Sequence, residues 1–100
     1  MRTAVIAPNQ NARIRYRVPP NHTIEFDVKA DHGVKTYIMR PEGLELFDSG
    51  AKTFKYYGGF QDPPRRHHNQ ELILPFDGHW YLVIVNPSNH TVEVEYEVSF

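Results

Sequence analysis

The sequence contains no cysteine among its 100 residues, which excludes disulfides, thiolate metal sites and cysteine nucleophiles. Small secreted domains more often carry disulfides, so this absence favours a reducing compartment and predicts a cytoplasmic protein. No segment approaches the ~20 apolar residues of a membrane span, and the apolar run in Met1–Pro8 is too short for a signal peptide. A formal charge of −1 lacks the basic excess that nucleic-acid binding requires. We therefore expect neither a membrane nor a nucleic acid as partner.

A helical pattern is also missing, because no stretch sustains an apolar period of 3.6 residues. Apolar and polar residues instead alternate in steps of two, which is typical of antiparallel strands with one buried face. The predicted strands are 12–18, 24–30, 34–39, 44–47, 52–57, 71–74, 79–85 and 92–98. Turn residues recur about every 8–12 positions. The sequence therefore predicts a single all-β domain over residues 1–100, an antiparallel, jelly-roll-like β-sandwich of about eight strands with strand 79–85 central.

The clearest local signals lie between residues 54 and 87. Asp77-Gly78 is a tight-turn signal between strands 71–74 and 79–85, and we expect a β-hairpin there. Trp80 is expected in the core, with its indole N–H bonded to a partner. The segment Tyr57-Gly58-Gly59-Phe60 fits a bulge or turn at the rim of the fold, or a loop that approaches a ligand closely, and we favour the rim.

Two strands carry rows of like charge on their polar faces. The rows are Arg13, Arg15 and Arg17 in one strand and Glu93, Glu95 and Glu97 in another. Like charges two residues apart repel unless opposite charges lie beside them, so we expect these strands to be neighbours in one sheet. The competing interpretation is that each row is simply a solvated face.

Catalytic signatures are absent, since there is no G-x-S-x-G elbow, phosphate-binding loop or G-x-G-x-x-G. Adjacent His67 and His68 point to opposite sides of an extended segment, and the other histidines stand alone, so metal-ligand spacing is missing. We expect no enzyme, no catalytic residue, no cofactor and no metal site. Protonating all six histidines would change the formal charge from −1 to +5 (−1 + 6), so a pH effect on association is expected at about pH 5–7.

A basic loop at 61–70 is the best candidate for a binding site. Pro63-Pro64 fix its backbone and so lower the entropy cost of presenting it to a ligand. Arginine can hold a carboxylate or phosphate through two hydrogen bonds, and neighbouring aromatic residues add contact surface. The predicted ligand-binding residues are Tyr56, Tyr57, Arg65, Arg66, His67, His68 and His79. A flexible, solvated loop is the competing interpretation.

Two segments carry a family resemblance, Lys55-Tyr56-Tyr57-Gly58-Gly59 and Pro75-Phe76-Asp77-Gly78-His79-Trp80. They resemble a bacterial domain-of-unknown-function family of short β-sandwiches with a Y-Y-G-G segment and a P-x-x-G-H-W hairpin. Some of its members are joined to TIR signalling domains. This chain departs from the family at Asn86-Pro87-Ser88-Asn89, where an acidic, glycine-rich turn is usual. The resemblance implies a bacterial β-sandwich, and a looser likeness to pre-peptidase C-terminal and GOLD-type sandwiches implies a non-catalytic accessory module.

These observations predict a non-enzymatic binding module that holds a protein partner or a small anionic ligand with the basic loop and nearby aromatics. One alternative is a structural self-association domain, a homo-oligomer built on edge strands, because an aromatic content of 13% exceeds what one small core holds. The second alternative is a small histidine-dependent metal enzyme.

Overall fold

The fold is organised by β3 (His22–Met39), an 18-residue strand that pairs with different neighbours along its two halves. The computed structural model describes residues 1–100. Its other elements are β1 (Arg2–Ile6), β2 (Asn11–Val18), α1 (Pro41–Asp48), β4 (Arg65–Leu74), β5 (Gly78–Val85) and β6 (Val92–Ser99). All strand pairs are antiparallel, in the order β1-β6-β3-β5-β2 with β4 also on β3. The prediction of an all-β, antiparallel fold is confirmed.

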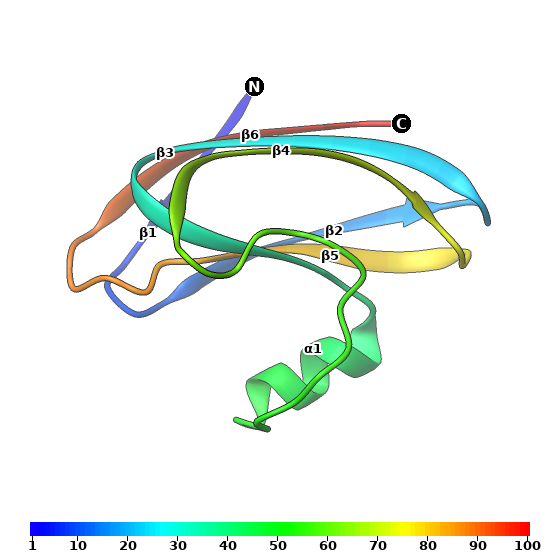
Figure 1. Cartoon of the computed structure of the whole chain (residues 1–100), viewed down its shortest axis with the longest axis horizontal. Helices are drawn as coiled ribbons and strands as arrows, with labels where there is room; N and C mark the ends of the chain where they lie inside the picture. Colours follow the sequence, from blue (N-terminus) through cyan, green and yellow to red (C-terminus); the bar gives the residue numbers. More distant parts are fainter.

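The sheet curls because β3 exchanges partners along its length. Its first half lies between β4 and β6, and the pairing with β4 changes register between Lys29 and Val34. Residues 35–39 then pair with β5. Figure 1 shows β6, β4 and the first half of β3 along one side of the curl, with β2 and β5 along the other. Strand 79–85 was predicted to be central; β5 is an interior strand, with β2 on one edge and β3 on the other, but the middle of the strand order is β3.

The core fills the inside of the curled sheet with the inward-pointing residues of its strands. Its 14 buried members are Ile6, Val18, Ile24, Phe26, Val28, Val34, Ile38, Leu74, Trp80, Leu82, Ile84, Val92, Val94 and Tyr96. Trp80 is fully buried, as predicted, and stacks on Tyr16 with ring centroids 4.9 Å apart. Its indole N–H has no hydrogen-bond partner, contrary to the expectation. Each large side chain buried in this way contributes roughly 1.5–3 kcal/mol, so this cluster is the main source of stability.

Residues 41–48 form helix α1, where the sequence predicts a turn followed by a strand. Pro41 occupies the first helical turn, where its fixed φ suits a helix and its missing N–H removes no hydrogen bond. Leu44 and Phe47, three residues apart, pack with Met39 and Val83 on the outer side of the sheet. This packing holds a helix of eight residues that would be unstable alone. No helix of the structure is long and apolar enough to cross a membrane.

The structure has six strands rather than about eight. The predicted strands 24–30 and 34–39 are one continuous strand, β3, and residues 52–57 form no strand. β1, which was not predicted, pairs with β6 at one edge of the sheet. The predicted hairpin is wrong: the chain does turn at Gly78, with φ +98, but β4 then pairs with β3 while β5 pairs with β2 and β3.

The predicted pairing of the two charged rows is also wrong. The arginine row lies on β2, which pairs only with β5, and the glutamate row lies on β6, between β1 and β3. Both strands turn their charged side chains outward because their apolar residues must enter the core. Burial therefore decides which strands pair, and exposed charges of modest energy do not override it.

The segment Tyr57–Phe60 extends the sheet beside the second half of β3, which β4 does not reach. Thr36 N–H donates to Phe60 O at 2.9 Å, and Ile38 N–H donates to Gly58 O at 3.0 Å. Gly59 has φ +107, and a Cβ there would lie 2.1 Å from Thr36 O. Only glycine allows this approach of two backbones, which agrees with the structural interpretation of the motif.

Candidate functional site

The predicted basic loop is mostly β-strand, so the loop prediction is wrong for residues 65–70. β4 begins at Arg65 and pairs with β3, and its His68 is buried. Arg65 and Arg66 are exposed, and the Arg65 guanidinium lies 4.9 Å from the centre of the Phe60 ring. His67 is exposed as well, with Nε2 2.6 Å from Asp27 Oδ1.

His68 is 1% exposed and fully hydrogen-bonded, so its ring does not reach the surface. Nε2 lies 2.9 Å from Val34 O and 3.0 Å from Arg65 O, and it carries the proton because carbonyls only accept. Nδ1 then accepts from Thr36 Oγ1 at 3.1 Å, and this hydroxyl accepts from Phe60 N–H at 3.0 Å. Burial lowers the pKa of His68, which keeps the ring neutral. The imidazole thus joins β3, β4 and the segment before β4.

Tyr56 and Tyr57 lie in different surroundings. Tyr56 is 45% exposed and meets the edge of Tyr37, with ring centroids 5.3 Å apart, in an aromatic group beside α1. Burial, with a smaller effect of Tyr56, raises the pKa of the Tyr37 hydroxyl. Tyr57 is half-buried, 4.8 Å from Phe76, with the Lys55 ammonium 5.0 Å from its ring centre.

His79 is far from the arginines of β4. Arg65 pairs with Val34, and the next residue, Lys35, pairs with Val85 at the end of β5. His79 precedes Val85 by six residues, which corresponds to about 20 Å along a strand. The predicted binding residues are therefore divided among the start of β4, the segment before it and the start of β5, and their role in binding stays a prediction.

A cationic surface that was not predicted as a site lies where β2 ends and β5 begins. Arg15 pairs with Tyr81 and Arg17 with His79, and paired residues project from the same side of a sheet. Arg15, Arg17 and His79 are exposed, and Tyr81 is half-buried. No carboxylate lies within 4.0 Å of either arginine. We call these four residues the arginine face.

Arg13, the remaining member of the arginine row, is already engaged by α1. Its two terminal nitrogens each donate to one carboxylate oxygen of Asp48 at 2.7 Å. This hydrogen-bonded guanidinium lowers the pKa of the Asp48 carboxyl. The row itself was visible in the sequence, but only the helix decides which of its arginines stay free.

The opposite outer surface of the curled sheet carries carboxylates. We call it the acidic face; its carboxylates are Glu25, Asp27, Asp31, Glu71, Glu93, Glu95 and Glu97 from β3, β4 and β6, and Lys29 and His67 lie among them. Two of its pairs stand directly opposite one another in register, Asp27 with Glu97 and Glu25 with Glu71. Like charges in this position destabilise a sheet.

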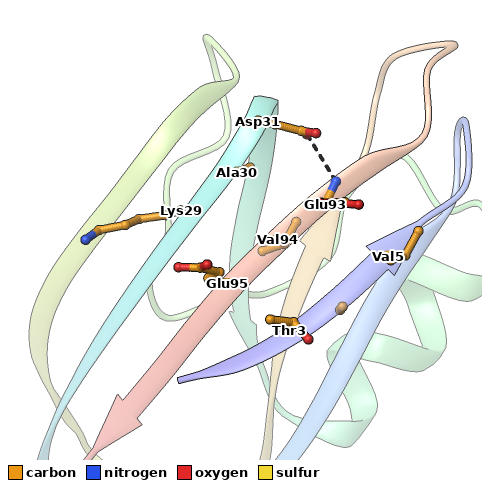
Figure 2. Close-up of a pocket in the computed structure, with 9 residues that line it drawn as sticks. Thr3, Val5, Lys29, Ala30, Asp31, Glu93, Val94 and Glu95 are labelled. Carbon is orange, nitrogen blue, oxygen red and sulfur yellow. Dashed lines mark hydrogen bonds between the residues drawn. The ribbon is translucent and has the colours of Figure 1, made fainter.

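A groove of about 490 Å³ crosses one corner of the acidic face, next to β1. Figure 2 shows its lining, which includes Thr3, Val5, Lys29, Asp31, Glu93 and Glu95. Glu93 N–H donates to Asp31 Oδ1 at 3.1 Å, the dashed line in Figure 2. Lys29 extends toward β4, and neither Glu93 nor Glu95 has a cation within 4.0 Å.

No group of three or more histidine, aspartate or glutamate side chains is arranged to hold a metal ion. Comparison with known protein families finds none that matches this chain, and a search of curated proteins finds no match either. The resemblance carried by the Y-Y-G-G and G-H-W segments stays a prediction.

Proposed function

We propose that the chain is a non-enzymatic interaction module that binds an acidic partner through its arginine face. The observation that carries this proposal is the pair of exposed guanidinium groups, Arg15 and Arg17, with no carboxylate of their own. Guanidinium groups hold carboxylates through two parallel hydrogen bonds, and Tyr81, which pairs with Arg15 in register, adds an amphipathic contact. Both arginines stand on a paired strand, so little backbone entropy is lost on binding.

The scaffold of this module, we infer, is a jelly-roll-like β-sandwich in which β3 passes from one layer to the other. Such an arrangement presents the arginine face on one outer surface and the acidic face on the other. The competing binding site within the same function is the one predicted from the sequence, with Arg65 and Arg66 at the start of β4.

A titration with decaglutamate, followed by amide NMR of the full chain at low salt, tests the proposal. Chemical-shift changes are expected at Arg15, Arg17, His79 and Tyr81. Exposed ion pairs contribute roughly 0.2–1 kcal/mol each, so Arg15→Ala/Arg17→Ala should weaken binding by about 2-fold to 30-fold. Arg65→Ala/Arg66→Ala removes the same charge and serves as the matched control, with affinity expected within about twofold of the parent.

Two results would reject the arginine face as the binding site. One is a loss of affinity in the control with none in Arg15→Ala/Arg17→Ala, which would move the site to β4. The other is a titration in which shifts are spread evenly over all exposed lysines and arginines, as a non-specific polyanion effect would produce.

A further inference from the structure

The arginine face and the acidic face match in spacing. Alternate residues of one strand repeat about every 6.6–6.8 Å, so Arg15 and Arg17 are as far apart as Glu93 and Glu95, or Glu95 and Glu97. Arg15 and Arg17 have no ion pair within the chain, and neither have Glu93, Glu95 and Glu97. β2 and β6 are not neighbours in the strand order, and although Arg15 and Glu97 line one pocket between β1, β2 and β6, no ion pair joins them.

The acidic face carries more carboxylates than cations, although Lys29 lies in register with Glu95 and His67 contacts Asp27. Its like-charge pairs, Asp27 with Glu97 and Glu25 with Glu71, are imposed by strand register. The carboxylates are spread in rows over three strands and do not converge on one point. This arrangement suits a row of cationic side chains better than a single ion. The groove adds Val5, 69% exposed, against which the aliphatic stem of an arginine can pack while its head reaches Glu93.

We infer that the partner of the arginine face is the acidic face of a second copy of this chain, an inference that rests on the proposed function. Arg15 and Arg17 of one copy lie against the Glu93–Glu97 row of the next. The contact is head-to-tail, so each pair of copies leaves one arginine face and one acidic face free for further copies. The two charged rows thus pair between molecules and not within one sheet.

The size of the contact sets its strength. Three strands about 4.8 Å apart and eight residues long present a planar area of only about 370 Å². Stable interfaces bury about 800 Å² on each partner, and part of the β2–β5 surface is occupied by α1. The association is therefore weak and depends on salt, because exposed ion pairs are screened.

Sedimentation equilibrium of the full chain at two salt concentrations is the test. Between about 20 mM and 300 mM NaCl the screening length falls from roughly 20 Å to 6 Å, and the association constant should drop about tenfold or more. Arg15→Glu/Arg17→Glu and Glu95→Lys/Glu97→Lys should each be monomeric. The chain carrying all four substitutions should associate again, because its charges are exchanged between the faces. Lys52→Glu/Lys55→Glu, with the same charge change elsewhere, should associate as the parent does.

A parent chain that stays monomeric at low salt overturns the inference, and so does association that the charge reversals leave unchanged. Circular dichroism checks that each variant folds, and Glu95→Gln/Glu97→Gln replaces the lysine variant if that one does not. Decaglutamate binding separates this inference from the proposed function. If the chain is strictly monomeric but decaglutamate still binds Arg15 and Arg17, only the inference of self-association is wrong. If the chain is monomeric and decaglutamate does not bind there either, both proposals fail.

Discussion

Replacing Gly59 by alanine tests the closest backbone contact in the fold. Gly59 has φ +107, a conformation that costs an L-residue of order 1–3 kcal/mol. The added Cβ would also lie 2.1 Å from Thr36 O, an atom held in place by β3. The segment must therefore move away from Thr36.

Moving the segment weakens three hydrogen bonds. Thr36 N–H donates to Phe60 O, Phe60 N–H donates to Thr36 Oγ1, and Gln61 Nε2 donates to Thr36 O. At a net ~0.5–1.5 kcal/mol each, their loss together with the conformational term lowers the free energy of unfolding by about 3–7 kcal/mol. That is a large part of the ~5–15 kcal/mol by which domains are stable.

Gly50 provides the matched control. It also has a positive φ, +80, but nothing lies within 4 Å of a Cβ placed there. Gly50→Ala should therefore lose only the conformational term, about 1–2 kcal/mol. Urea unfolding followed by the fluorescence of Trp80, the sole tryptophan and fully buried, measures both variants. Equal losses in the two variants would refute the reasoning, because the contact with Thr36 would then have no energetic effect.

Two further predictions concern buried polar groups. Because burial lowers the pKa of His68 in the folded chain, the unfolded chain takes up its proton first as pH falls below about 6.5, and the free energy of unfolding should decrease there. Urea unfolding at pH 7.5 and 5.5 checks this, and a pH dependence identical in His68→Gln would contradict it. Asn86→Ala should cost about 3 kcal/mol, or roughly 15 °C in melting temperature, because Nδ2 donates to Ile6 O, Ala7 O and His90 O in a buried turn. Calorimetry against the exposed control Asn89→Ala measures it, and equal melting temperatures would rule the network out as a source of stability.

The strands that were predicted correctly are those whose burial pattern is local. In β2 and β6, apolar and polar residues alternate strictly because each strand has one face in the core. β5 is almost wholly apolar because α1 covers its outer side. α1 itself was missed because two helical turns offer only the spacing of Leu44 and Phe47, which a short strand could also contain.

The candidate surfaces depend on contacts that a linear pattern does not contain. His68 meets Thr36 across 32 positions, so its burial could not be seen beside the exposed His67. Asp77-Gly78 does mark a turn, but turn chemistry does not say that the two strands it joins belong to different sides of the curl. The arginine row was visible, whereas its division into one paired and two free arginines required the position of Asp48.

The position of β6 has a consequence for how the protein is made. Residues 92–96 pair with residues 2–6, and residues 94–99 pair with the first half of β3, so β6 lies between two strands that are synthesised well before it. Until β6 leaves the ribosome, β1 has no partner strand and one edge of β3 stays unpaired. An unpaired strand edge invites non-native pairing with other chains. The nascent chain should therefore remain protease-sensitive until residues 92–99 have emerged, and then become protected in a single step.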